Sequence, residues 1–299
     1  MSDALYLIDA SYFVFRAYYS MPADMADPNG RPVNALYGFA RFMCELVELE
    51  RPRYLAVAFD ESLSSSFRNR LYPAYKANRE PAPPELKEQF ARCRSFCECF
   101  GAPHFASAEY EADDIIGTLV SRMRLKGFRS TVVTRDKDLS QLIGQNDEFW
   151  DYAAGERLAY SQIESRFGVK PEKVADFLAL TGDAVDNIPG VPGIGKKTAA
   201  VLLGEFDSLE HLYDNLDKVG ALPLRGAEGI IRKLVEHRHI AFMARELTRI
   251  ACDIPIEIQP HHLQLRAPDA SGISAFFEKS GFGAGLRRSI ERIQARARD

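Results

Sequence analysis

The chain has 299 residues, which is enough to bury one large hydrophobic core or two smaller ones. Hydrophobic residues make up 46%, as in ordinary globular proteins, and no apolar run approaches the roughly 20 residues that span a bilayer. The net charge of −4 taken alone argues against a nucleic-acid partner. If nine of the acids bind cations and their negative charges are left out of the sum, the rest of the chain is positive.

The first half of the chain alternates short apolar runs with amphipathic segments. It starts without the basic and apolar regions of a signal peptide, so we expect a cytoplasmic protein. The five cysteines are odd in number, so we expect no disulfide framework. Apolar runs predict strands at residues 5–8, 54–59 and 131–134. Periodicity and glycine stops predict helices at residues 34–48, 85–100 and 112–126. The alternation predicts an α/β fold with a mostly parallel central sheet flanked by helices.

Residues 61–84 interrupt this pattern with basic and aromatic side chains and prolines. We interpret this segment as an excursion from the sheet. Within it, Tyr75, Lys76 and Arg79 could stack on a base and contact a phosphate, and Arg16 could do the same from the first helix. For any single residue, a solvated basic loop remains the alternative.

From about residue 161 the chain is predominantly helical. The predicted helices lie at residues 161–167, 171–180, 198–203 and 208–216. We therefore divide the chain into an α/β core at 1–180 and a helical region at 181–299. The glycine- and proline-rich residues 188–195 interrupt the helices.

Acidic residues follow the three predicted strands, at Asp9, Asp60 and Asp136. Because the carboxyl ends of parallel strands meet at one edge of a sheet, these carboxylates can converge there. Further acids fit the same face. One short motif contains Glu111, Asp113 and Asp114, a second adds Asp138 to Asp136, and a third contains Asp183 and Asp186. Each acid alone could cap a helix or a turn. Together they favour a site for two or more divalent cations, Mg²⁺ or Mn²⁺, since oxygen ligands suit these ions and paired ions stabilise phosphoryl transfer.

The segment 188–199 (IPGVPGIGKKTA) superficially resembles a nucleotide-binding P-loop. That motif needs Ser or Thr after its lysine, but Lys197 follows Lys196, and no apolar strand precedes the segment. The alternative is a helix-hairpin-helix, in which Gly193 and Gly195 flank an apolar residue and the next helix turns its N–H groups to a phosphate. The two lysines add charge without base specificity, so this segment favours DNA-backbone binding.

Six stretches resemble, in the same order, the 5′ nuclease family, which includes the 5′–3′ exonuclease domain of bacterial type I DNA polymerases, phage 5′ exonucleases and flap endonucleases. They are LIDASYFVFRA, VAFD, SFRNRLYPAYKANR, YEADDIIGTL, TRDKDLSQL and LTGDAVDNIPGVPGIGKKTA, and they cover most of residues 5–204. The resemblance implies a PIN-like nuclease core, a helical arch at about residues 61–100 and a C-terminal helix-hairpin-helix region that completes the acidic site. No polymerase domain follows, so we expect a free-standing member.

The resemblance also implies roles for individual residues. The metal-binding acids of the family fall on Asp9, Asp60, Glu111, Asp113, Asp114, Asp136, Asp138, Asp183 and Asp186, with Asp114 near both metals. Lys76 matches the active-site lysine, and Arg16 matches a basic residue near the scissile phosphate. The implied DNA contacts are Arg68, Tyr75, Arg79, Gly193, Gly195, Lys196 and Lys197. A K⁺ ion at the helix-hairpin-helix is a further expectation.

The expected function is a monomeric, metal-dependent 5′–3′ exonuclease and flap endonuclease that acts in replication or repair on DNA with a free 5′ end, a 5′ flap or a branch. Two alternatives stay open. One is a non-catalytic DNA-junction binder on the same fold, although such a protein gains nothing from carboxylates that repel phosphate. The other is a nuclease directed at RNA primers in an RNA–DNA hybrid, which the same site could serve.

Overall fold

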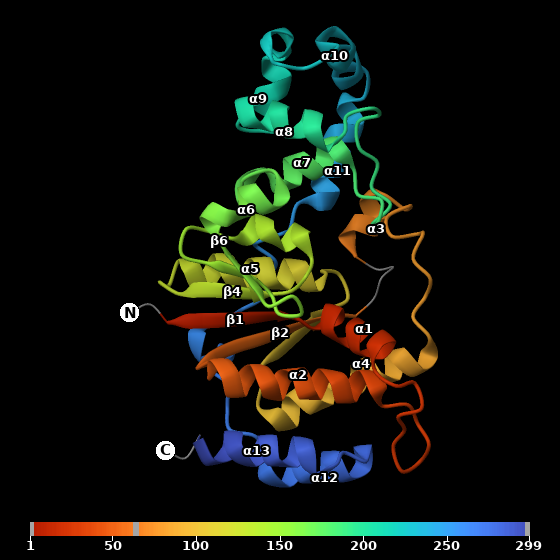
Figure 1. Cartoon of the computed structure of the whole chain (residues 1–299), viewed down its shortest axis with the longest axis vertical. Coiled ribbons are helices and arrows are strands. Elements are labelled where there is room, and N and C mark those ends of the chain that lie inside the picture. The colour runs from red at the N-terminus through yellow and green to blue at the C-terminus, as the bar shows by residue number, and fades with distance from the viewer. Residues whose placement is uncertain (1–2, 62–65, 297–299) are drawn as a thin grey trace.

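The computed structural model describes residues 3–61 and 66–296 and shows an elongated molecule built around one sheet (Figure 1). Within these residues the sheet has six strands in the order β3-β2-β1-β4-β5-β6. Only β6 is antiparallel to its neighbour, β5. The strands are β1 (Ala4–Asp9), β2 (Tyr54–Asp60), β3 (His104–Ser107), β4 (Arg129–Val133), β5 (Glu148–Asp151) and β6 (Glu156–Ala159). The predicted mostly parallel α/β sheet is confirmed.

The central strands are buried on both faces, which explains why they are continuous apolar runs. In β1, Tyr6 and Ile8 face one hydrophobic cluster, whereas Leu5 and Leu7 face the other. Helices cover both faces (Figure 1). They are α1 (Ala10–Ser20), α2 (Asn34–Glu50) and α4 (Pro84–Phe100) on the first face and α5 (Ala112–Arg124) on the second.

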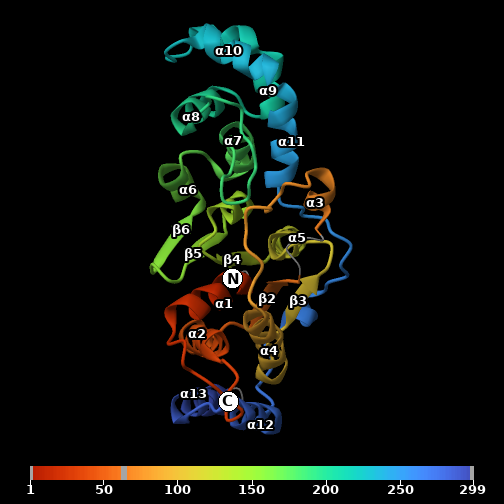
Figure 2. The same cartoon turned by 90° about the vertical axis from the view of Figure 1, so that its right-hand side faces the viewer.

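The excursion after β2 contains one short helix, α3 (Phe67–Leu71), and an extended stretch that descends to α4 (Figure 2). The apolar side chains of α4, among them Leu86, Phe96 and Phe100, are buried in the core. The predicted arch at 61–100 therefore extends into the core, because α4 is part of that core and Ala82, just before it, packs against it. Residues 62–65 of the predicted arch lie outside the described residues.

The chain from residue 160 to 248 forms a helical lobe beyond the sheet (Figure 1). The lobe has its own hydrophobic core, to which Tyr75 of the excursion also contributes. A 3-10 helix, η1 (Lys137–Leu142), follows β4 and precedes the lobe. The lobe comprises α6 (Tyr160–Phe167), η2 (Pro171–Lys173), α7 (Val174–Thr181), α8 (Lys196–Glu205), α9 (Leu209–Asp214), η3 (Leu216–Ala221), α10 (Ala227–Glu236) and α11 (Arg238–Thr248).

After α11 the chain returns along the sheet, where the Leu265 N–H donates to the carbonyl of Arg53 at 3.0 Å. It ends in η4 (Pro260–Leu263), α12 (Ala270–Ser280) and α13 (Ala284–Arg296). The last two helices bury Phe277 and Ile290 against α2 and α4, at the far end of the molecule from α10 (Figure 1). Residues 181–299 are thus not one spatial unit, because an amphipathic pattern predicts a helix but not the core that it covers. No helix in the described chain is long and apolar enough to cross a membrane.

Candidate active site

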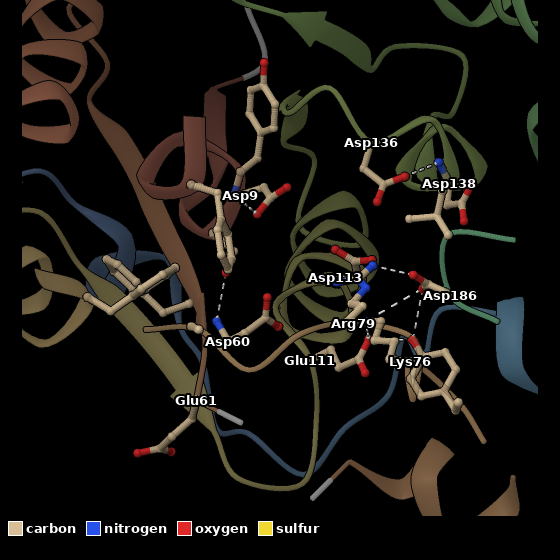
Figure 3. A pocket seen from close by; sticks show the side chains of 18 of the residues that line it. Asp9, Asp60, Glu61, Lys76, Arg79, Glu111, Asp113, Asp136, Asp138 and Asp186 are labelled. Carbon is tan, nitrogen blue, oxygen red and sulfur yellow. Dashed lines mark hydrogen bonds and ion pairs between the residues drawn. The ribbon is translucent and has the colours of Figure 1, made fainter. Parts of the chain in front are cut away.

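A pocket of about 1090 Å³ opens at the sheet edge where β1 and β2 end. It is lined by eight of the nine predicted acids, which come from the ends of two strands, the start of α5, the start of η1 and the turn after α7. They are Asp9, Asp60, Glu111, Asp113, Asp136, Asp138, Asp183 and Asp186. Figure 3 shows most of them around one shared space, with Lys76 and Arg79 beside Asp186.

Backbone and hydroxyl donors hold the two strand-end aspartates in place. Asp9 caps α1 by accepting the N–H of Tyr12 at 3.2 Å, and its second oxygen accepts the Thr134 hydroxyl at 2.9 Å. Asp60 accepts the N–H of Ala112, in the first turn of α5, at 2.8 Å. The parallel register of β1 and β2 and these bonds together bring both carboxylates to the start of α5.

The start of α5 carries two of the pocket acids. Glu111 is the N-cap residue, and its side chain accepts from Lys76 at 2.8 Å and from the Tyr75 hydroxyl at 3.0 Å. Burial opposes ionisation of Glu111, but the attraction of Lys76 and Arg68 together with the hydrogen bonds outweighs it, so the pKa of this carboxyl lies below its usual value. Asp113 lines the same pocket, whereas Asp114 turns away from it.

The loop after β4 supplies Asp136 and Asp138. Asp136 caps η1 by accepting the N–H of Asp138 at 2.9 Å, and its own N–H donates to the Thr134 hydroxyl at 2.9 Å. Thr134, which is fully buried, therefore ties Asp136 to Asp9. Our sequence analysis missed this residue, although a hydroxyl just before an Asp-x-Asp motif at a strand end was a usable signal.

The turn after α7 supplies Asp183 and Asp186. It is closed by two backbone hydrogen bonds between Asp183 and Ile188, of 2.9 and 2.8 Å. The two ends of this turn approach each other so closely that glycine is required, because a Cβ on Gly190 would lie 2.3 Å from the backbone nitrogen of Gly182. Gly190 belongs to the P-loop-like segment 188–199, but its structural role is this close backbone approach.

The aspartates at the centre of the pocket favour their protonated forms. Burial, followed by repulsion from Asp60, raises the pKa of Asp9 to about 7. Burial, followed by repulsion from Asp136, raises the pKa of Asp138 to about 8. The pKa of Asp113 is likewise raised well above its usual value by burial and then by Asp136. Cations bound between these groups would allow them to ionise together.

The excursion places three side chains against the acids. Lys76 has a left-handed backbone (φ 55°), which is held by its N–H donating to the carbonyl of Asp186 at 2.9 Å. Its ammonium lies 2.8 Å from Glu111 and 3.7 Å from Asp186, and Arg79 forms an ion pair with Asp186. Burial opposes the charge of Lys76, but attraction to Glu111 and to its other acidic neighbours together outweighs it, and the pKa of Lys76 lies well above the usual value. Tyr75 is buried and also reaches Asp186, at 3.3 Å.

Three predicted site residues are not brought to the pocket. Asp114 is fully buried, and both of its oxygens accept from the equally buried guanidinium of Arg68, at 2.7 and 2.8 Å. Asp114 therefore has no free oxygen facing a metal in the pocket, and Arg68 cannot reach DNA. Neither side chain lines the pocket, because a motif shows which residues are present but not which way their side chains turn. Arg16 is exposed on α1, near Tyr152, and does not line the pocket.

The remaining acids fit a divalent cation. Oxygen atoms are the ligands that Mg²⁺ and Mn²⁺ prefer. Two buried oxygens, Oε1 of Glu111 and Oδ1 of Asp138, have no hydrogen-bond partner among the described residues. No three acidic, His or Cys side chains of the described chain are arranged to hold an ion by themselves. Mg²⁺ usually keeps several waters and is bound by one or two carboxylates together with substrate phosphates.

The predicted helix-hairpin-helix joins α7 to α8. Gly193 has a positive φ of 77°, and Gly195 is the N-cap of α8. The side chains of Lys196 and Lys197, in the first turn of α8, are exposed. Because a helix and not a strand precedes this turn, the structure agrees with rejection of the P-loop. Lys233 of α10 lies against Gly193, which the sequence did not indicate.

Two family models match consecutive parts of the chain. They describe the N-terminal resolvase-like domain of 5′–3′ exonucleases, at residues 4–168, and their C-terminal SAM fold, at residues 169–271. A 5′–3′ exonuclease of Aquifex aeolicus is 34% identical over 89% of this chain and 88% of its own length. DNA polymerase I of Bacillus subtilis is 35% identical over 95% of this chain, but the match spans only 32% of the polymerase.

Solved structures share the fold at lower identity. T5 5′-exonuclease with bound zinc has a TM-score of 0.67 at 20% identity, over 98% of this chain and 99% of that chain. The catalytic core of Rad2 in complex with a DNA substrate has a TM-score of 0.65 at 16% identity, over 99% of this chain and 93% of that chain. The family models and the full-length likeness to the Aquifex protein show that the chain belongs to the 5′–3′ exonuclease family, whose members are nuclease hydrolases.

Proposed function

We propose that this chain is a divalent-metal-dependent nuclease that hydrolyses DNA phosphodiester bonds near free 5′ ends, both as a 5′–3′ exonuclease and at 5′ flaps. One observation carries the proposal. Eight carboxylates from five separate segments meet in a single pocket beside Lys76 and Arg79. A structural role does not require so many mutually repelling acids, whereas cation binding does.

The chain's own residues would hold two or more ions, Mg²⁺ or Mn²⁺. We assign Asp9, Asp60, Glu111 and Asp113 to one group of ligands, and Asp136, Asp138, Asp183 and Asp186 to the other. When bound, such ions supply Lewis-acid activation of water and stabilisation of the leaving oxygen. Thr134 bonds to Asp9 of the first group and to Asp136 of the second group. These bonds would hold the two ligand residues in place before an ion binds.

Lys76 and Arg79 would stabilise the scissile phosphate. Both side chains carry charge at the rim of the acids, and the docked backbone of Lys76 holds its ammonium in the pocket. Positive groups fixed where negative charge develops lower the barrier to phosphoryl transfer. We give Arg16 no catalytic role, since it lies outside the pocket lining.

The helix-hairpin-helix would hold the duplex. The N–H groups that begin α8 have no intrahelical partners, and Lys196 and Lys197 add positive charge beside them. Such a surface binds the phosphate backbone without reading bases. We include a K⁺ ion at this turn in the proposal, because backbone carbonyls and a phosphate can share one.

The named ligands of the structural neighbours support the substrate class. T5 D15 flap endonuclease was solved with DNA and metal ions, Rad2 with a DNA substrate and human GEN1 with Holliday junction DNA. We propose DNA with a free 5′ end, a 5′ flap or a branch as the substrate of this chain, with RNA–DNA hybrid as a further one. A monomer acting in the cytoplasm completes the proposal.

The test uses a 3′-labelled 5′-flap duplex with Mg²⁺, Mn²⁺ or EDTA. Asp183→Asn removes one pocket charge but keeps an oxygen that can accept the N–H of Val185, as Asp183 does at 2.8 Å. We expect metal-dependent cuts near the branch for the wild-type protein, and cleavage lost but DNA binding kept for the variant. Asp253→Asn, at an exposed position, is the matched control and should cut normally.

Wild-type turnover by Asp183→Asn would reject the assignment of the acids. Tight flap binding without cleavage under either metal would instead favour a junction-binding protein on the same fold. A 5′ strand of RNA, compared with the same strand of DNA, decides whether primers are substrates.

A further inference from the structure

A buried ion pair outside the pocket joins three segments of the chain. Arg68 lies in α3, at the base of the excursion, and is 2% exposed, while Asp114 in α5 is fully buried. The guanidinium donates to both oxygens of Asp114, at 2.7 and 2.8 Å. It also donates to the carbonyls of Leu247 and Arg249, at 2.8 and 2.9 Å. Four hydrogen bonds from one side chain thus link the excursion, α5 and the end of α11.

Asp114 completes the connection from its side. One of its oxygens accepts the N–H of Ala251 at 2.9 Å, and the other accepts the N–H of Glu111 at 3.1 Å. Glu111 is the pocket acid that pairs with Lys76. The Arg68 guanidinium also lies 3.8 Å from the Glu111 carboxylate, so the ion pair adjoins the acids directly. On its other side it is bonded to the segment that leaves the helical lobe.

The ion pair connects α5 to the helical lobe through the end of α11. Helix α11 packs along α7, and α7 leads into both the Asp183 turn and the helix-hairpin-helix. The carbonyls that Arg68 binds belong to the last turn of α11 and the residue after it, where a cation also complements the helix dipole. The guanidinium thus fixes the lobe that would hold DNA relative to the α5 end of the acidic pocket.

We propose that Arg68, held by Asp114, is a positioning residue that sets the distance between the duplex-binding lobe and the acidic pocket, and thereby the phosphodiester bond that is cut. This rests on the proposed function. A buried ion pair is a weak source of net stability, because desolvation offsets much of its attraction, so we take its geometry as the reason for its presence. Only arginine can supply this fork of four directed bonds, since lysine has three donors on a single atom.

The test measures where and how fast a 5′-flap duplex is cut by the wild type, Arg68→Lys and Asp114→Asn. We expect single-turnover rates to fall by about 10- to 100-fold, because a displacement of about 1 Å has that effect on a reacting geometry. We also expect cuts to spread over neighbouring phosphodiester bonds, while DNA affinity stays nearly unchanged. Arg70→Ala is the matched control, since Arg70 lies on the same short helix but is exposed and pairs only with Glu109 among the described residues.

The spread of cut positions separates positioning from simple stabilisation. Loss of folded molecules would reduce the amount of product but leave the cut at the same bond. Normal rates and an unchanged cut position in both variants, with an active wild type, would overturn the inference alone. Failure of both variants to fold would assign the pair to stability and would also overturn it. An inactive wild type would reject the proposed function, and the inference with it.

Discussion

Lys76 donates to the Glu111 carboxylate at 2.8 Å, so the excursion and the first residue of α5 meet inside the acidic pocket. The contact is fixed from both sides. Lys76 is held by its backbone bond to Asp186, and Glu111 is held as the N-cap of α5. The ammonium of Lys76 is therefore held in the pocket although its residue belongs to neither a helix nor a strand.

Replacing Lys76 with alanine should lower the single-turnover cleavage rate by about 100-fold, the usual effect of removing one charge-stabilising donor. It should also raise the pKa of Glu111, because burial then acts without its main opposing attraction. Cleavage assays at saturating metal and DNA measure the first effect. Lys126→Ala, at an exposed position whose ammonium contacts Gln259, is the control, and a Lys76→Ala rate equal to it would remove Lys76 from the site.

Replacing Thr134 with valine should damage the pocket without changing its charge. Valine has nearly the same shape but can neither donate to Asp9 nor accept the N–H of Asp136. The unpaired buried groups should lower the free energy of unfolding by about 1–3 kcal/mol and weaken metal binding. Urea unfolding and titration calorimetry with Mn²⁺ measure these effects. Thr134→Ser keeps the hydroxyl and should behave like the wild type; equal losses in both variants would contradict the account.

The metal-free protein should lose stability as pH rises. Unfolded aspartates lose their protons near pH 4, whereas the pKa of Asp9 is about 7 and that of Asp138 about 8 in the folded chain. The folded state binds more protons across this window, so the free energy of unfolding falls from about pH 4 to pH 8. Thermal unfolding in EDTA at several pH values measures the slope.

Two additions sharpen the pH experiment. Mg²⁺ or Mn²⁺ should reverse the trend, since ions bind the ionised carboxylates and more tightly at higher pH. Asp138→Asn removes one of the shifted groups and should flatten the slope in EDTA. A stability that rises between pH 5 and 8 without metal would show that the aspartates are not under mutual repulsion.

Much of the fold could be predicted because its signals are local. The buried central strands are apolar on both faces, and Gly101, the C-cap of α4, has the expected positive φ. Gly127, predicted as the stop of the next helix, also has a positive φ but lies in the turn after α5. The shorter strands β3, β5 and β6 were not predicted, because four residues carry little periodicity. The packing of α12 and α13 on the α/β core could not be predicted, because it depends on contacts about 200 residues apart in sequence.

The sequence predicted which acids lie near the strand ends, but it did not predict the direction in which each side chain points. Asp113 and Asp114 are neighbours in one motif, but the helix turns one into the pocket and the other toward Arg68. Only the partner of Asp114, 46 residues away, decides between a ligand and a buried ion pair. Local sequence carries no information on such a partner.

Replacing Gly190 with alanine should open the turn that carries Asp183. The added Cβ would lie 2.3 Å from backbone atoms of Gly182 and Thr181, which cannot move aside as a flexible side chain could. We expect a loss of about 1–3 kcal/mol in the free energy of unfolding and a cleavage rate lowered further than stability explains. Gly204→Ala, where a Cβ on α8 meets nothing, should be neutral or stabilising. Equal stability and activity of the two variants would contradict the close approach.

Replacing both Lys196 and Lys197 with alanine should weaken DNA binding by a similar factor for every sequence. If each lysine contacts one phosphate, the slope of log affinity against log salt concentration should become shallower by about 2. The rate at saturating DNA should change little, because these residues begin α8 and do not line the acidic pocket. Fluorescence anisotropy across a salt series measures the slope, with Lys279→Ala, an exposed position on α12, as the control. A large loss of saturating rate with an unchanged salt slope would move these lysines from duplex binding to the chemistry of the cut.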